Sequence, residues 1–154
     1  MSIRIAAEDP GTDEIVALLE AGEAHAAALY PAESNHFLSI DSLRASNVSF
    51  IVARDDEGDA VGTGAVSIND GWAELKRMWV VPSARGKGIS KVLLLDLEDR
   101  ARNASAQWLR LETGIFSHEA LGLYERTGFV RCPPFADYLP DPNSVFMEKR
   151  LAAG

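Results

Sequence analysis

Hydrophobic and polar residues alternate along several stretches of the chain, a period that is typical of β-strands with one buried face. Residues 2–6 alternate in this way, and residues 48–81 are long enough for three strands separated by turns at DDEGD (55–59) and NDG (69–71). Further strands are predicted at 107–112, 129–132 and 145–151. The pattern therefore predicts about seven strands.

Other stretches carry apolar residues at helical spacing. The first follows Asp13, which we expect to cap a helix, and it ends before Pro31, because proline cannot continue a helix. The remaining predicted helices are a short one near 41–46 and two longer ones over 88–103 and 117–128, the last ending at Gly128. The resulting order, β-α-α-β-β-β-α-β-α-β-β, predicts an α/β (α+β) fold with a mixed sheet and about four helices.

The alternation slips by one residue within the third strand of the central group (WAELKRMWVV). Ala73 and Leu75 hold one phase of the pattern. Two basic residues follow, and the apolar phase returns at Met78 and Val80. A strand absorbs such a slip with a β-bulge, which keeps its apolar face buried. We therefore expect a bulge at 76–77 that bends the strand away from its neighbour, opens a gap and frees a backbone N–H.

The next ten residues, VPSARGKGIS (81–90), place two glycines and two basic side chains directly before a predicted helix. Such a turn presents free N–H groups and the positive end of a helix dipole to an anion. Gly86 and Gly88 would let a pyrophosphate approach the backbone. Arg85 and Lys87 would add charge-assisted contacts. The alternative is a simple connecting turn with solvated charges.

Two standard phosphate motifs do not apply to this chain. The pattern G-x-x-x-x-G-K-[ST] is absent from the sequence. GTGAVS (62–67) begins like a dinucleotide-binding fingerprint but leads into more strand rather than into a helix.

Charge is distributed unevenly along the 154 residues, a length that fits one domain, 1–154. The net charge is -8, yet residues 1–75 hold 3 Lys/Arg and 14 Asp/Glu, whereas residues 76–154 hold 12 Lys/Arg and 9 Asp/Glu. The acidic total argues against nucleic-acid binding, which depends on neutralising phosphates. An acidic half would favour a cationic ligand at one end of the site, although neutral or anionic ligands stay open.

Cys132 is the only cysteine, which excludes an internal disulfide and favours a reducing, cytoplasmic location. With three scattered histidines, the chain holds no metal-ligand pattern. No apolar run reaches the roughly 20 residues of a membrane span, and the N-terminus does not resemble a secretory signal.

Two segments together resemble the GNAT N-acetyltransferase superfamily. In VVPSARGKGIS, Arg85 and Gly88 match the family's [QR]-x-x-G-x-[GA] motif, with Ser90 where glycine or alanine is usual. In SHEALGLYERTGF, the residues that match the family's N-x-x-A-x-x-L-Y-x-x-x-G-F segment are Ala120, Leu123, Tyr124, Gly128 and Phe129, while Ser117 replaces the usual asparagine. The element order matches as well, so the resemblance covers nearly the whole chain and implies a mostly antiparallel sheet with a splayed, bulged fourth strand.

The resemblance implies acetyl-CoA as the cofactor, with its pyrophosphate at the glycine-rich loop and its pantetheine arm along the bulged strand. The residues implied to bind acetyl-CoA are Met78, Trp79, Val80, Arg85, Gly86, Lys87, Gly88, Ile89, Ser90, Ser117 and Tyr124. A small-molecule or peptide amine is implied as the acceptor, and a homodimer is left open. A non-catalytic acyl-CoA sensor or structural module and a phosphate-binding module of another kind, such as a nucleotide binder, are the alternatives.

Acetyl transfer to an amine needs a base for the amine and an acid for the departing thiolate. The resemblance implies Tyr124 as the acid, a role that suits a phenol that stays protonated at neutral pH. Glu74, on the bulged strand, is the expected base, often through water in the family, and Glu112 is its rival at the acceptor side. The alternative for both carboxylates is an ion pair, for which Lys76 and Arg110 are available.

The acceptor is expected to meet two further segments. His36 lies in the loop PAESNHF, which should flank the cleft, and Tyr138 lies in the proline-rich stretch 133–144. Proline lowers the entropy lost when a loop becomes ordered, so this stretch is interpreted as a stiff flap over the acceptor. An ordinary long turn between the last two strands is the alternative.

Overall fold

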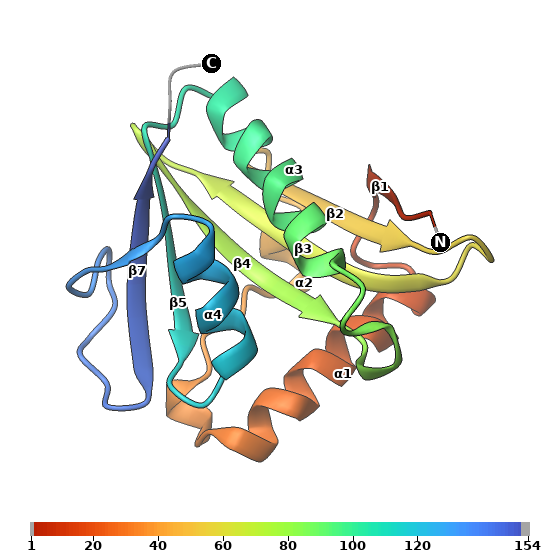
Figure 1. Ribbon diagram of the computed structural model, residues 1–154, viewed down its shortest axis with the longest axis horizontal. Coiled ribbons are helices and arrows are strands. Elements are labelled where there is room, and N and C mark those ends of the chain that lie inside the picture. The colour runs from red at the N-terminus through yellow and green to blue at the C-terminus, as the bar shows by residue number, and fades with distance from the viewer. Residues whose placement is uncertain (1, 152–154) are drawn as a thin grey trace.

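The predicted strands form one mixed sheet in the computed structural model, which describes residues 2–151 (Figure 1). The seven strands lie in the order β1-β2-β3-β4-β5-β7-β6, and only β4 and β5 are parallel neighbours. Their bounds are β1 (Arg4–Ala7), β2 (Val48–Arg54), β3 (Ala60–Ile68), β4 (Trp72–Val80), β5 (Trp108–Gly114), β6 (Val130–Arg131) and β7 (Ser144–Arg150). The predicted α/β class, strand number and mostly antiparallel sheet are confirmed.

Helices cover both faces of this sheet. On the near face in Figure 1, α3 and α4 pack against strand residues such as Leu75, with Leu93 of α3 fully buried. On the far face, α1 and α2 pack against other strand residues such as Val52, with Leu19 of α1 buried. The helices are α1 (Asp13–Leu29), α2 (Ile40–Leu43), α3 (Ile89–Asn103) and α4 (His118–Arg126), with single 3-10 turns η1 (Ala32–Ser34) and η2 (Pro82–Ala84).

The helix ends differ from the sequence pattern in two places. Thr12, not Asp13, caps α1, because its hydroxyl accepts a hydrogen bond from the Ile15 N–H at 3.4 Å. Asp13 is the first helical residue, where a carboxylate still favours the positive end of the helix dipole. The short helix α2 lies earlier than predicted, since Ser39 caps it and it ends at Leu43.

The predicted bulge is present in β4. Thr63 of β3 pairs with Trp79, but Ala65 pairs with Lys76, so the bulged strand has one residue more than its partner. Arg77 adopts a left-handed backbone with φ 57, as the bulged residue of such a pair can. The hydroxyl of Thr63 donates to the Arg77 carbonyl at 2.7 Å and thereby stabilises the irregular turn of the backbone.

β4 and β5 are paired over their first residues only. The parallel ladder joins Trp72 to Trp108, Ala73 to Leu109 and Glu74 to Arg110. Beyond these pairs, from Leu75 to Val80, β4 has no strand on its β5 side within residues 2–151. Figure 1 shows the two strands diverging toward their C-terminal ends. The register slip read from the sequence thus coincides with an opening in the middle of the sheet.

Candidate active site

A cleft of about 1070 Å³ lies where β4 and β5 diverge. Its walls are α1 with the loop 34–37, the second half of β4, the end of β5, the loop 84–91 and one side of α4 along its whole length. The predicted site residues that line it are His36, Met78, Trp79, Val80, Arg85, Gly86, Gly88, Ile89, Ser90, Glu112, Ser117 and Tyr124. Glu74, Lys87 and Tyr138 do not line it. One cavity therefore brings together most of the residues that the sequence singled out.

The loop before α3 has a backbone conformation that favours glycine. Gly86 has φ 79 and Gly88 has φ 78, and a Cβ atom at either position would meet nothing within 4 Å. Backbone conformation, rather than lack of space, explains both glycines. Gly88 precedes α3 without a side-chain cap among the described residues, so the first N–H groups of this helix are available to an anion.

Arg85 and Lys87 differ in their placement. The Arg85 Nε donates to the carbonyl of Val80 at 3.3 Å, and its guanidinium lies 5.3 Å from the centre of the Trp79 ring. Arg85 therefore follows the open edge of β4 into the cleft. Lys87 is exposed and lies outside the lining of the cleft, so its predicted contact with the cofactor stays a prediction.

Tyr124 is almost completely buried, yet it lines the cleft. Its ring packs edge to face against Phe129, with 5.5 Å between the ring centres. Its hydroxyl makes no hydrogen bond to another residue in the described part of the chain. Burial raises the pKa of the Tyr124 hydroxyl, which keeps the phenol protonated at neutral pH.

Glu112 lies near the end of β5, in the wall of the cleft. Burial raises the pKa of its carboxyl group, and the nearby Glu74 acts in the same direction. The contact with Ser144, followed by the charges of His36 and Lys76, lowers the pKa of Glu112 and partly opposes this effect. A carboxylate with a raised pKa at the edge of an open cleft is suited to accept a proton near neutral pH.

Glu74 lies beside the cleft rather than in its lining, and its carboxylate is already engaged. The Tyr138 hydroxyl donates to Glu74 Oε2 at 2.5 Å, and the Lys76 ammonium lies 3.1 Å from the same oxygen. Lys76 also donates to the Tyr138 hydroxyl. Burial, followed by the contact with Glu74, raises the pKa of Tyr138. The ion pair with Lys76 that the sequence left as an alternative for Glu74 is therefore present.

Two loops meet at this end of the cleft. His36 contacts the Tyr138 ring edge to face, with 5.1 Å between ring centres. Ser34 donates to the carboxylate of Asp141 at 2.7 Å, which joins the same two loops a second time. The proline-rich stretch 133–144 thus packs onto the loop after α1, as a flap would, although its side chains stand behind the lining of the cleft.

Sequence reasoning missed Tyr30, which spans the cleft from the end of α1. Its hydroxyl accepts from the Phe116 N–H at 3.0 Å and lies 3.0 Å from the Ser117 hydroxyl. A Cβ atom at Gly114 would lie 1.9 Å from the Tyr30 hydroxyl oxygen, so this glycine makes room for the ring. No local motif marks Tyr30, because its partners lie 86 and 87 residues further along the chain.

The cleft has a different charge from the chain as a whole. Five of its lining residues are basic, namely Lys76, Arg77, Arg85, Lys91 and Arg126, and two are acidic, Glu112 and Glu119. None of the acidic residues among 2–75 lines it. Several of these carboxylates instead pair with arginines elsewhere, as Glu8 and Glu14 do with Arg54. The acidic N-terminal half is therefore no guide to the charge of the ligand.

Residues 2–151 contain no group of three or more His, Cys, Asp or Glu side chains placed to hold a metal ion. Within the same residues, no helix is long and apolar enough to cross a membrane.

A helix start with available N–H groups, an open strand edge and a buried tyrosine surround one cleft. Residues 7–129 match the model of the acetyltransferase (GNAT) family. This match covers more than half of the chain, and the chain therefore belongs to the GNAT family. It is an N-acetyltransferase that depends on acetyl-CoA, as the sequence resemblance implied.

Two relatives agree with this assignment. The chain is 44% identical to an IAA acetyltransferase of Azospirillum brasilense over 97% of its own length and 99% of that protein. It is 40% identical to an uncharacterised N-acetyltransferase of Bacillus subtilis over 79% of this chain and 82% of that one.

Solved structures share the fold over nearly the whole chain. A Klebsiella pneumoniae protein described as an acyl-CoA N-acyltransferase has a TM-score of 0.83 and 37% identity, covering 97% of this chain and 98% of that one. An N-acetyltransferase of Thermoplasma acidophilum in complex with coenzyme A has a TM-score of 0.74 and 21% identity, covering 97% of this chain and 99% of that one. At that identity, the second likeness is one of fold alone.

Proposed function

We propose that this acetyltransferase transfers the acetyl group to an amine of a small molecule or peptide by direct attack within a ternary complex. Residues 1–154 act as one domain, and the homodimer is a hypothesis that light scattering would test. Nucleic acid is not an expected ligand of a chain with a net charge of -8. The single observation that supports direct transfer is that one cleft contains the anion-binding loop, Tyr124 and Glu112.

The residues present fit coenzyme A. The first N–H groups of α3, with Arg85 beside them, would hold the pyrophosphate. The open edge of β4 at Met78, Trp79 and Val80 offers backbone groups to the amide-containing pantetheine arm. A backbone N–H on this edge would polarise the acetyl carbonyl, as in an oxyanion hole. Acetyl-CoA supplies the activated acetyl thioester.

The residue roles follow from the proton balance of the reaction. The amine nitrogen forms the new C–N bond as the C–S bond breaks. Glu112 accepts the proton that the amine loses, directly or through a water molecule. Tyr124 donates its hydroxyl proton to the departing thiolate sulfur. Each group ends the step with the opposite protonation state, and exchange with solvent restores both.

Glu112 is a better base than Glu74 on geometric grounds. Glu112 lines the cleft, whereas Glu74 is bonded to Tyr138 and Lys76 behind the lining. A base must come within hydrogen-bond reach of the amine or of one bridging water. The role originally expected of Glu74 therefore passes to Glu112 in this proposal, and Glu74 instead orders the flap.

Turnover by a Tyr124→Phe variant tests the acid. We expect the variant to keep its affinity for acetyl-CoA in calorimetry and to lose about 10²-fold or more in kcat, because only proton donation is removed. The assay would follow thiol release with a panel of amines that includes peptides, together with IAA, the compound in the name of the Azospirillum relative. An unchanged kcat would remove Tyr124 from the mechanism, and a panel without any acetylated amine would contradict the proposed function itself.

A further inference from the structure

Arg77 is a buried cation in the wall of the cleft that the catalytic steps do not use. Its side chain is 6% exposed and its residue lines the cleft. Both Nε and Nη2 donate to a single acceptor, the carbonyl of Leu38, at 3.2 and 2.9 Å. The Phe37 ring lies 4.8 Å from the guanidinium carbon. The guanidinium is thus held in one orientation by the loop that follows α1.

The remaining donors of Arg77 have no protein acceptor within hydrogen-bond distance among residues 2–151. A guanidinium carries five N–H donors, and Nη1 has only one contact in the described part of the chain, with the Glu23 carboxylate at 3.7 Å. That distance is beyond a hydrogen bond, and the Glu23 side chain is 42% exposed. Burial lowers the pKa of Arg77, as expected for a charge that is desolvated more than it is paired.

Lys76, the neighbouring cation, provides an internal comparison. Its ammonium has three donors and three partners, which are the Tyr138 hydroxyl, the His36 carbonyl and the Glu74 carboxylate. Lys76 therefore has no donor left for a ligand. Of the two basic residues at the bulge, Arg77 alone retains free N–H groups.

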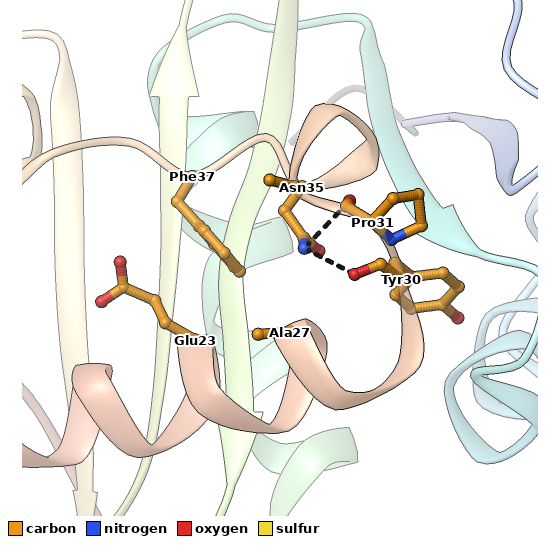
Figure 2. Close-up of a pocket in the computed structure, with 7 residues that line it drawn as sticks. Glu23, Ala27, Tyr30, Pro31, Asn35 and Phe37 are labelled. Atoms are coloured by element: carbon orange, nitrogen blue, oxygen red, sulfur yellow. Dashed lines mark hydrogen bonds between the residues drawn. The ribbon is translucent and has the colours of Figure 1, made fainter.

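The surroundings of Arg77 lead toward the acceptor end of the cleft. Glu23 of α1 and Phe37 of the following loop are among the residues that line a second pocket (Figure 2). This pocket has a volume of about 540 Å³. This pocket shares Tyr30, Asn35 and Phe37 with the main cleft. Arg77 lines the main cleft rather than this pocket, but its guanidinium contacts Glu23 and Phe37 of the pocket wall. An acceptor that extends from the pocket into the cleft would therefore meet Arg77 at the bulge of β4, away from the loop at 84–91 that would hold the cofactor.

A carboxylate is the group that best fits a fixed guanidinium with free N–H donors, because its two oxygens can accept two parallel hydrogen bonds. We propose that the acceptor of this acetyltransferase carries a carboxylate as well as its amine, as an amino acid does, and that Arg77 binds that carboxylate. This inference rests on the proposed function, since it names the acceptor class of the same cleft. Glu112 would receive the proton of the amine, and Arg77 would fix the other end of the molecule.

Glu23 provides a second, independent test of the role of Arg77. Its carboxylate is the only acidic group near Nη1 of Arg77 among residues 2–151, and it would compete with the carboxylate of the acceptor. Neutralising Glu23 should therefore strengthen the selection for acids, whereas neutralising Arg77 should abolish it. Two variants with opposite effects are difficult to explain by general damage to the fold.

The experiment compares amino acids with their own primary amides as acceptors, so that a neutral group of similar size replaces the carboxylate. Because the amide also lowers the pKa of the α-amine, the ratio is measured at a pH where both amines are deprotonated, and each variant is compared with the wild-type protein. In the wild-type protein we expect kcat/KM for the acid to exceed that for the amide by about tenfold or more, as for one charged hydrogen-bonded pair. Arg77→Asn should bring this ratio close to one, and Glu23→Gln should raise it. Asparagine tolerates the left-handed backbone at this position, which guards against a folding defect.

Arg44→Asn is the matched control, because Arg44 is an exposed arginine outside the cleft that pairs with Asp9. It should leave the acid-to-amide ratio unchanged. The proposal is overturned if the wild-type protein acetylates amides as well as acids, or if Arg77→Asn lowers kcat/KM for both by the same factor. Either result leaves the proposed function intact, whereas failure with every amine would contradict that function instead.

Discussion

Glu74 and Glu112 are the two candidates for the base, and their contacts in the folded protein, rather than their positions in the sequence, distinguish them. Glu74 and Glu112 lie on neighbouring strands, and both had an ion pair or a base as possible roles. In the folded protein, the Tyr138 hydroxyl and the Lys76 ammonium occupy the Glu74 carboxylate. Glu112 faces the cleft with a raised pKa. The difference arises from a tyrosine 64 residues away from Glu74.

Glu112→Gln should lower kcat/KM by about 10²- to 10⁴-fold, because general base catalysis contributes that much. Glu74→Gln should have a smaller effect, since that residue only positions the flap. The pH profile supplies a second measurement. Glu112 acts when deprotonated, and burial raises its pKa above the usual 4.5, so kcat/KM should fall as the pH drops through a value higher than that of an ordinary glutamate. Loss of that acid limb in Glu112→Gln is expected, and an identical limb in the variant would assign it to another group.

Among the secondary-structure elements, β4 and the start of α3 together form one continuous wall of the cleft. The bulge at Arg77 turns β4 away from β5, and the strand then leads through η2 into a glycine turn whose backbone opens the first N–H groups of α3. The second half of β4 and the loop at 84–91 line the same cleft, so a long anionic ligand can follow the strand from one to the other. The sequence indicated each part, because a slip in alternation and a glycine pair before a helix are both local signals.

Arg85 and Lys87 offer a matched pair within this element. Arg85→Ala should raise the dissociation constant of acetyl-CoA by about tenfold or more, as expected for a lost charge-assisted contact. Lys87→Ala should change it far less, because Arg85 lines the cleft and Lys87 does not. Calorimetry with acetyl-CoA at one ionic strength would measure both. Equal effects of the two variants would mean that the loop binds acetyl-CoA through its net positive charge rather than through a specific contact of Arg85.

At the scale of the whole molecule, one side chain ties the two walls of the cleft together. Tyr30, at the end of α1, reaches across to Phe116 and Ser117 at the start of α4. Its ring also lies parallel to that of Phe116, 5.8 Å away between ring centres. The helices on opposite faces of the sheet are thereby joined where the sheet itself is open.

Tyr30→Phe should lower the free energy of unfolding by about 1 kcal/mol, because the partly buried N–H of Phe116 loses its acceptor. Ser117→Ala should cost less, since the Tyr30 hydroxyl keeps its bond to Phe116. Urea unfolding followed by circular dichroism would compare the two variants with the wild-type protein. A Tyr30→Phe protein as stable as the wild type would show that this hydrogen bond contributes nothing to the stability of the fold.

Local patterns along the chain were sufficient to predict the strand and helix order, the bulge, the glycine loop and the segment around Tyr124. Alternation, helical spacing and backbone conformation depend on residues close in sequence, so each leaves a readable signal. The helix caps show the limit of such signals, since Thr12 and Asp13 are equally suitable residues and only the backbone geometry decides between them.

The charges that face the ligand depend on contacts between residues that are distant in the sequence. The acidic residues of the N-terminal half lie outside the lining of the cleft, Lys76 is saturated by partners from two distant loops, and Arg77 keeps free donors. Apart from the ion pair between Lys76 and Glu74, these contacts join residues 39 or more positions apart, and the period of a strand or helix carries no information about them. Local motifs were enough to predict the family and the cofactor. The candidate base and the inferred class of acceptor rest on how the loops pack around the splayed strands, which local motifs do not record.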